Sequence, residues 1–357
     1  MNSGTRNTLP FSVKYCVILL GLILTFYVLV IGQSIFNPLL AAFIVALQVK
    51  PLCYHMEKMK IPRLISTILS LVLILALLGG LSFFFSLQIA EITSDINSVI
   101  DSFDAVFDEL QQWASTQFGI APPDQIIYLK NAIATLLKNS TAFYKKMLST
   151  TAGFFSAFFL FVIALFFFIY YRSFFVSLLY QIVRAKNHSF VKKILDNVEH
   201  VVRQYAGGLF LVILIIATLN TLGLLTLGVK HAIFFGCFAA LLIIIPYLGI
   251  TIGALLPTIY ALATMDSLWY PLGVVALFVS VQFLEGSFIT PNIVGTRVSI
   301  NPFVIIVGIF ASGMLFGMMG VILIIPVLAI IKVISDQIDM LKPLGYLLGS
   351  PSSEVEG

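Results

Sequence analysis

Long apolar stretches dominate the chain, and the C-terminal half is almost continuously apolar from Leu209 to Val333. About 20 apolar residues suffice for a helix to cross a hydrocarbon layer about 30 Å thick. The 357 residues are 60% hydrophobic and 10% charged, whereas soluble domains carry roughly 25% charged residues. We therefore predict an all-α integral membrane protein with about eight transmembrane helices, a lipid environment and no large soluble catalytic domain.

The predicted helical segments follow directly from these stretches. In chain order they are Tyr15–Ile31, Phe36–Val49, Leu64–Leu87, Ala152–Tyr171, Leu209–Leu227, Ala232–Ile245, Ile250–Thr264, Trp269–Leu284, Phe303–Phe316 and Val321–Val333. Each of the last two falls below the minimum of about 17 residues for a straight crossing, so a re-entrant hairpin is at least as good an interpretation as two spans.

Charge sets the predicted topology. The segments Lys50–Arg63 and Arg172–Tyr205 are rich in Lys and Arg, which favours the cytoplasm, and the tail carries Lys332 and Lys342. We therefore expect both termini to be cytoplasmic. The chain from Leu87 to Tyr128 has seven acidic residues and no Lys or Arg, and we expect it outside.

An amphipathic insert is predicted at residues 88–150. Apolar residues recur there at helical spacing from Ile92 to Leu110, and Pro122–Pro123 separates a second amphipathic helix. The insert is either a lid or subunit contact, or a pair of helices on the membrane surface. It divides a three-helix membrane segment (1–87) from a span with a cytoplasmic helical segment (151–208), a transport core (209–335) and a cytoplasmic tail (336–357).

We predict an inverted repeat within the core. Leu209–Thr264 and Trp269–Val333 each consist of one ordinary span, a short arm, a Gly-containing break and a second arm with a proline. The breaks are Pro246-Tyr247-Leu248-Gly249 and Gly317-Met318-Met319-Gly320. Interrupted segments at matching positions of inverted halves indicate a transporter binding site, because unpaired backbone groups need protein or water around them. The alternative is that Gly and Pro are simply common in membrane helices.

Polar residues at membrane depth are the other candidates. Glu285 ends an apolar span, with Gln282 on the same helical face. The segment from Gly286 to Arg297 has too many breakers for us to expect a stable helix, and it places Thr290, Asn292 and Arg297 nearby. Glu285 either pairs with Arg297 or contacts substrate in a hydrated crevice.

Two asparagines complete the site hypothesis. Asn301-Pro302 has the pattern of a helix N-cap followed by proline, with Ser299 as an alternative cap. Asn220 lies within an apolar span, where it either forms an interhelical hydrogen bond or contacts substrate. The candidate substrate-binding or gating residues are Asn220, Pro246, Tyr247, Gly249, Gln282, Glu285, Pro291, Asn292, Gly295, Arg297, Asn301, Gly317 and Gly320.

No enzyme, metal or cofactor motif is evident. The four histidines lack the i, i+4 pairing of a helical metal site, and the three cysteines form no C-x-x-C pair. No run of like charges indicates a nucleic-acid partner.

These motifs in this order resemble the autoinducer-2 exporter family of bacterial inner-membrane transporters. The resemblance rests on Pro246-Tyr247-Leu248-Gly249 and on the run Glu285, Pro291, Gly295, Asn301-Pro302, Gly313, Gly317, Gly320 and Pro326. It implies a permease for a small polar solute such as a quorum-sensing signal, or a monovalent cation/proton antiporter, in a homo-oligomer with the pentamer as candidate form. One departure is Leu209, where the family usually has glutamine. A non-transporting membrane scaffold and a channel are the competing readings.

Overall fold

The computed structural model describes residues 11–94, 151–183, 188–245, 248–295 and 300–350. Within these ranges every named element is helical, and the β-structure is limited to an isolated bridge between Ile300 and Gly349. The all-α class is therefore confirmed. The predicted insert lies largely outside the described residues.

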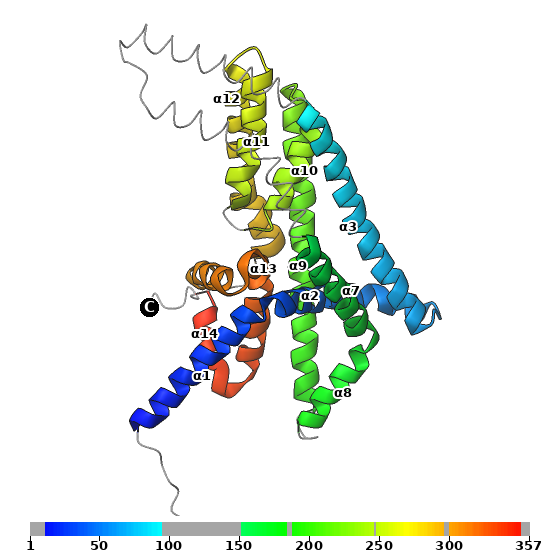
Figure 1. The fold of residues 1–357 in the computed structure, drawn as a ribbon, viewed down its shortest axis with the longest axis vertical. Helices are drawn as coiled ribbons and strands as arrows, with labels where there is room; N and C mark the ends of the chain where they lie inside the picture. The colour runs from blue at the N-terminus through cyan, green and yellow to red at the C-terminus, as the bar shows by residue number, and fades with distance from the viewer. Residues whose placement is uncertain (1–10, 95–150, 184–187, 246–247, 296–299, 351–357) are drawn as a thin grey trace, which may run out of the picture.

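Five helices form the N-terminal part (Figure 1). They are α1 (Phe11–Ile31), α2 (Gln33–Lys58), α3 (Arg63–Ser94), α7 (Thr151–Tyr170) and α8 (Arg172–Ile182). Helix α2 packs closely on α7, where Ala42 and Cys53 lie against Leu165 and Ile169 in a buried cluster. Small residues on α2 permit this approach, which is the usual basis of helix association in membranes.

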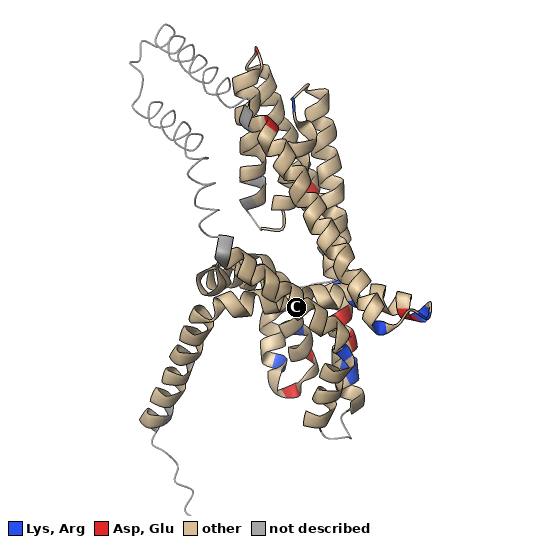
Figure 2. Ribbon diagram, turned by 45° about the vertical axis from the view of Figure 1, so that its right-hand side comes forward, with Lys and Arg blue, Asp and Glu red and all other residues tan. Residues whose placement is uncertain are grey.

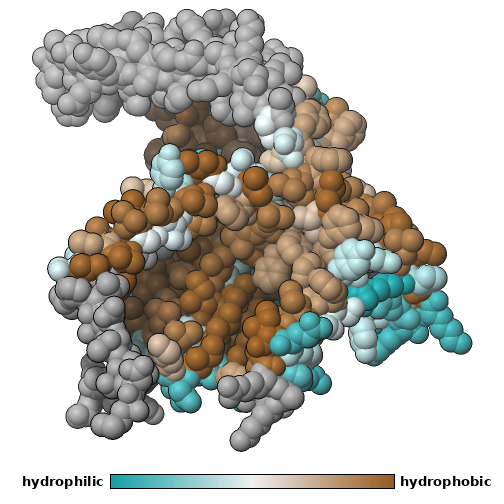
Figure 3. Space-filling view, turned by 60° about the horizontal axis from the view of Figure 1, so that its bottom comes forward, coloured by the Kyte–Doolittle hydropathy of each residue, from teal (hydrophilic) through white to brown (hydrophobic). Residues whose placement is uncertain are grey.

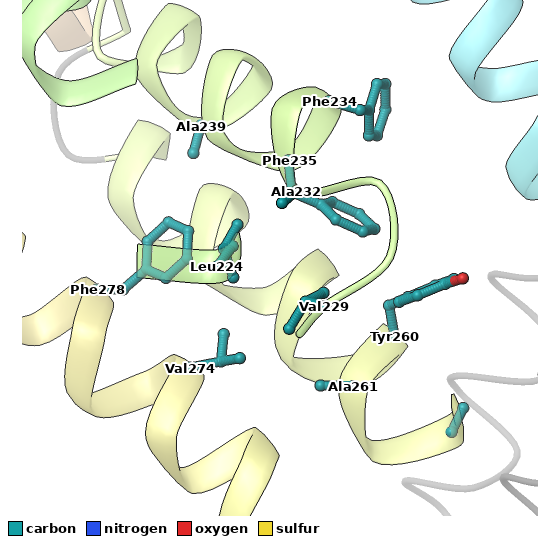
Figure 4. Close-up of a cluster of buried hydrophobic side chains, with 11 residues drawn as sticks. Leu224, Val229, Ala232, Phe234, Phe235, Ala239, Tyr260, Ala261, Val274 and Phe278 are labelled. Carbon is teal, nitrogen blue, oxygen red and sulfur yellow. The ribbon is translucent and has the colours of Figure 1, made fainter. Parts of the chain in front are cut away.

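Four helices build most of the C-terminal core. They are α9 (His188–Thr226), α10 (Ala232–Leu242), α11 (Leu248–Thr264) and α12 (Trp269–Leu284). Figure 4 shows their main contact, in which Leu224, Phe235, Ala261 and Val274 from the four helices meet in one buried cluster. The antiparallel pair α10–α11, called here the first hairpin, is thus held between α9 and α12.

The remainder begins with two π-helical turns, η2 (Glu285–Ile289) and η3 (Pro291–Gly295). Helix α13 (Pro302–Gln337) follows, then the short η4 (Asp339–Leu341) and α14 (Lys342–Leu348). Our expectation that residues after Gly286 are too rich in breakers for a helix is wrong for 286–295. Pro291 begins η3 and has no N–H to donate, so it supplies no hydrogen bond to the preceding turn.

Helix α13 is two arms rather than one rod, because Gly317 leaves helical geometry with φ 62° and ψ −149°. A side chain at Gly308 would lie 3.0 Å from Ile324, and one at Gly313 would lie 3.2 Å from Val321. Residues 308 and 324 would be about 24 Å apart along a straight helix. The chain therefore folds back at Gly317, and we call these two arms the second hairpin.

Helix α9 differs most from its predicted extent. The predicted span Leu209–Leu227 is the second half of one helix of 39 residues, about 58 Å long at 1.5 Å per residue. Its polar first half stays helical because Val198 and Val202 are buried against Ile44 of α2. Helices α2 and α3 also extend past the predicted ends at Val49 and Leu87, to Lys58 and Ser94.

Six helices in the described part of the chain are long and apolar enough to cross a membrane. They are Gln33–Lys58, Arg63–Ile92, Gly153–Tyr170, His188–Thr226, Trp269–Val294 and Pro302–Gln337. Helix α10, with 11 residues, is about 16 Å long and cannot cross a layer about 30 Å thick by itself. The chain is an integral membrane protein.

Charged residues gather at one end of the molecule, around the α2–α3 turn, the start of α9 and the α13–α14 region (Figure 2). There Glu57 pairs with Arg172, and Lys50 of α2 pairs with Glu199 of α9. Viewed from that end, the visible surface is mostly apolar, with hydrophilic side chains along one border (Figure 3). This pattern fits a lipid-facing body with one polar end.

Candidate functional site

A cavity of about 20 Å³ lies among α9, α10, α11 and α12. It is lined by Ile216, Asn220, Ala239, Ile243, Gly249, Phe278, Val281, Gln282 and Glu285. A space of this size holds about one water molecule. Four of the lining residues, namely Asn220, Gly249, Gln282 and Glu285, are candidates named from the sequence. They come from both halves of the predicted repeat.

Glu285 is the charged group of this cavity. It ends α12 and begins η2, and its side chain is half-buried. The Gln282 amide donates to Glu285 Oε2 at 2.8 Å, as helical spacing predicted. The Thr290 hydroxyl donates to Oε1 of the same carboxylate. Both carboxylate oxygens therefore have protein donors, which orient the carboxylate beside the cavity.

Asn220 supplies the second polar group. It lies in the membrane half of α9 and is only 2% exposed. Its Oδ1 atom is buried and has no hydrogen-bond partner among the residues that the structure describes. A buried amide oxygen without a donor costs free energy, on the order of 1–3 kcal/mol. The cavity beside it has room for a donor, so Asn220 can accept a hydrogen bond from water or solute.

The first hairpin shapes the cavity wall through close backbone contacts. A side chain at Gly249 would lie 2.2 Å from the Leu242 carbonyl oxygen, and one at Gly253 would lie 2.8 Å from Ala239. Real Cβ atoms do not approach so closely, so these positions require glycine in this arrangement. The hairpin arms can meet tightly only because both glycines lack a side chain.

The π-helical segment packs on α9 at another glycine. A side chain at Gly208 would lie 3.2 Å from the Ile293 carbonyl oxygen and 3.1 Å from Val294. This contact packs η3 against α9 at Gly208, which precedes the cavity residues Ile216 and Asn220 on the same helix. Pro291 begins η3, Gly295 ends it, and Asn292 is exposed and does not line the cavity. Thr290, not Asn292, is the residue from this segment that reaches Glu285.

The second hairpin holds the remaining predicted residues. Asn301 caps α13 as predicted, because its Oδ1 accepts a hydrogen bond from the Phe303 N–H at 3.0 Å. Gly317 makes the break, and Gly320 is buried in the turn, where a side chain would lie 2.2 Å from the Ser312 carbonyl oxygen. None of these three residues lines the cavity. The structure thus separates them from Glu285.

Three predicted residues, Pro246, Tyr247 and Arg297, lie outside the described residues, and so does the Glu285–Arg297 pair. One polar residue that the sequence analysis did not select is Asn37 of α2. Its amide donates to the Phe316 carbonyl at 3.0 Å, beside the break of the second hairpin. Asn37 could have been noticed in the sequence, because it is a polar residue within the predicted apolar segment Phe36–Val49.

The family of the chain is shown by comparison of its sequence with known protein families. A model of the AI-2E family transporters matches residues 17–340. The chain belongs to this family. The match covers both hairpins and every residue that lines the cavity, so the sequence resemblance is confirmed.

Known relatives of this AI-2E family member are also named transport proteins. The putative transport protein YueF of Bacillus subtilis is 26% identical over 309 residues, which cover 84% of this chain and 83% of YueF. A putative transport protein of Mycobacterium tuberculosis, MT0215, is 26% identical over 91% of this chain and 88% of its own length. The AI-2 transport protein TqsA of Escherichia coli is 24% identical over 90% of this chain and 92% of TqsA. This AI-2E family member is a membrane transport protein.

Proposed function

We propose that this protein is a secondary transporter that moves a small polar solute, such as a quorum-sensing signal, across the bacterial inner membrane. The observation that carries the proposal is the cavity in which Asn220 of the first repeat unit meets Gln282 and Glu285 of the second. Binding sites of transporters with inverted repeats form at such junctions, beside discontinuous helices. A relative that covers nearly the whole chain is named an AI-2 transport protein.

Transport through this site requires the hairpins to move. The cavity has room for about one water, so a solute of several carbon atoms enters only when its walls separate. The first hairpin is the wall best suited to move, because its short arm α10 ends at a break beside Gly249. We propose that both hairpins are re-entrant and that their broken tips gate access from the two sides.

The basic end of the molecule is proposed to face the cytoplasm. Lys58, Lys60 and Arg63 lie at the α2–α3 turn, and Arg172 begins α8. The tail helix α14 packs at the end of α13, with Gly345 against Asp336. A green fluorescent protein fused after residue 357 should fluoresce in cells. A fusion that is dark while an alkaline phosphatase fusion at the same place is active would reverse the orientation.

The test of the site is Glu285→Gln in purified protein reconstituted into liposomes, with autoinducer-2 as the solute. The substitution keeps the shape and the Thr290 and Gln282 neighbours but removes the charge. We expect autoinducer-2 flux to fall by at least tenfold. Asp266→Asn, a carboxylate in the exposed α11–α12 turn, is the control and should keep full flux. Undiminished flux of Glu285→Gln, at every pH tested, would remove Glu285 from the mechanism.

A second candidate function is monovalent cation/proton antiport. It is favoured by the pairing of a carboxylate with an unpartnered amide oxygen at one cavity, because oxygen ligands suit hard cations. Sodium added to acid-loaded liposomes should then dissipate the pH gradient with wild-type protein and not with Glu285→Gln. Sodium-independent autoinducer-2 flux together with a stable pH gradient would exclude this alternative.

A further inference from the structure

Asn37 forms a polar contact between two segments that are far apart in the sequence. Its Nδ2 atom donates to the carbonyl oxygen of Phe316 at 3.0 Å, across 279 positions of the chain. Asn37 is half-buried in α2, within a candidate membrane span. An asparagine in such a span is costly unless it is hydrogen-bonded, so this bond accounts for its place there.

The acceptor lies at the one point of α13 where the helix breaks. Phe316 directly precedes Gly317, whose positive φ and extended ψ belong to a region that is almost limited to glycine. The last carbonyl groups before a helix break lose their regular partners in the next turn. The Asn37 amide supplies a donor from outside α13 at this position.

Asn37 is also the polar end of the α2 face that carries the second hairpin. Asn37, Leu40, Ile44 and Leu47 recur at spacings of three and four and therefore share one helical face. Leu40, Ile44 and Leu47 pack with the second arm of the hairpin, which contributes Leu323, Val327 and Ile330 to the same cluster. The apolar part of this face holds the arm, and Asn37 meets the tip.

Helix α2 itself is firmly placed. Its opposite contacts are the buried cluster with α7 around Ala42 and Cys53 and the ion pair from Lys50 to Glu199 of α9. A bond from Asn37 therefore ties the hairpin tip to a fixed helix.

We infer that Asn37 is a positioning residue, which holds the tip of the second hairpin on α2 and must release it for the hairpin to move. The expected effect on flux rests on the proposed transport function, whereas the expected effect on the hairpin tip does not. Asn37 does not line the cavity, so it acts on the position of the hairpin and not on solute binding.

The first experiment needs no solute. Hydrogen–deuterium exchange is followed by mass spectrometry on the full-length protein in lipid nanodiscs, for wild type and for Asn37→Leu, which keeps the shape and removes the donor. A hydrogen bond of ordinary net strength shifts an opening equilibrium by about two- to tenfold. We expect exchange of amides 313–320 to be faster by that factor and exchange in the first hairpin, residues 236–260, to be unchanged.

Control variants separate the bond from its surroundings. Gln33→Leu removes an exposed amide one turn earlier on α2 and should leave exchange at the tip unchanged. Asn37→Gln keeps a donor and should stay within twofold of wild type. Asn37→Ser, whose side chain is shorter, serves if Asn37→Leu does not assemble, and it should also speed exchange at the tip. Unchanged exchange at 313–320 in both Asn37→Leu and Asn37→Ser, or an equal increase in the first hairpin, would overturn the inference.

The second experiment measures autoinducer-2 flux at increasing solute concentrations. Because the Asn37 bond must break before the hairpin moves and Asn37 lies outside the cavity, Asn37→Leu should raise the maximal rate two- to tenfold and leave the half-saturating concentration unchanged. A changed half-saturation with an unchanged maximal rate would contradict a positioning role. The two proposals fail separately, because faster exchange at the tip stands even if Glu285→Gln retains full flux.

Discussion

The two hairpins differ in what surrounds them. The first packs on both α9 and α12, with Phe235 of α10 and Ala261 of α11 buried in the same cluster as Leu224 of α9 and Val274 of α12. The second is covered on one side, by α2, α9 and the tail, while its first arm leaves Phe310 71% and Met314 85% exposed. The first hairpin borders the cavity, and the second does not.

The glycines at the breaks of the two hairpins are required for different reasons. In the first, Gly249 and Gly253 are needed because neighbouring atoms leave no room for a side chain. In the second, Gly317 has open space around it, and its positive φ is what requires glycine. The glycines at the two breaks thus serve close packing in the first hairpin and a sharp reversal in the second, which also packs closely at Gly320.

The largest expected effect comes from adding a methyl group at the tight backbone contact of the first hairpin. In Gly249→Ala, the new Cβ would lie 2.2 Å from the Leu242 carbonyl oxygen, and backbone cannot give way cheaply. We expect a loss of about 3 kcal/mol or more in the free energy of unfolding, and poor recovery of monodisperse protein. The loss is measured as a lower midpoint of thermal unfolding in detergent. The control is Gly286→Ala, which has open space at its Cβ and should not lower the midpoint. If Gly249→Ala unfolds at the wild-type midpoint, close packing is not the reason that the first hairpin needs glycine there.

A smaller loss is expected at the tip of the second hairpin. Gly317→Ala meets no neighbour but must adopt a positive φ, which costs about 1–3 kcal/mol. Gly80→Ala in α3 also meets open space, has no positive φ and should not be destabilised. If Gly317→Ala is as stable as Gly80→Ala, the reversal at Gly317 is not constrained by its backbone and the contrast with Gly249 is lost.

The smallest effect belongs to the exposed turn after the second hairpin. The Lys342 ammonium, by its hydrogen bond and its charge, lowers the pKa of Asp339, and the pKa of Lys342 is raised in turn. A lowered carboxyl pKa supplies stability above its ordinary range that is lost as the pH falls through the lowered value. Because both groups are fully exposed, Asp339→Asn should not shift the unfolding midpoint at neutral pH in physiological salt. A clear shift would show that the tail stabilises the hairpin through this pair.

Much of the local structure could be predicted from the sequence. The length of the apolar stretches located the membrane helices, and the Asn301-Pro302 pattern located the start of α13. The i−3 spacing brought Gln282 to Glu285. The ends of α2 and α9 were placed wrongly, because their polar turns are kept helical by contacts such as Ile44 with Val198 and Val202, which hydropathy does not contain.

The candidate site was predicted only in part. Glu285, Gln282, Asn220 and Gly249 do share one cavity. Of the residues expected near Glu285, Thr290 reaches the carboxylate, whereas Asn292 is exposed because the segment is helical and turns it away. Proximity in sequence is a poor guide once the backbone conformation of the linking segment is mistaken.

The sequence by itself determined the class of protein, its helices, its two breaks and its family, because these depend on hydropathy and on contacts three or four residues apart. The tertiary structure decided which distant groups meet: Asn220 with the Glu285 cavity, and Asn37 with the Phe316 carbonyl. Such meetings depend on how whole helices pack, and a shift of one helix by a single turn, about 5.4 Å, would separate every one of these pairs.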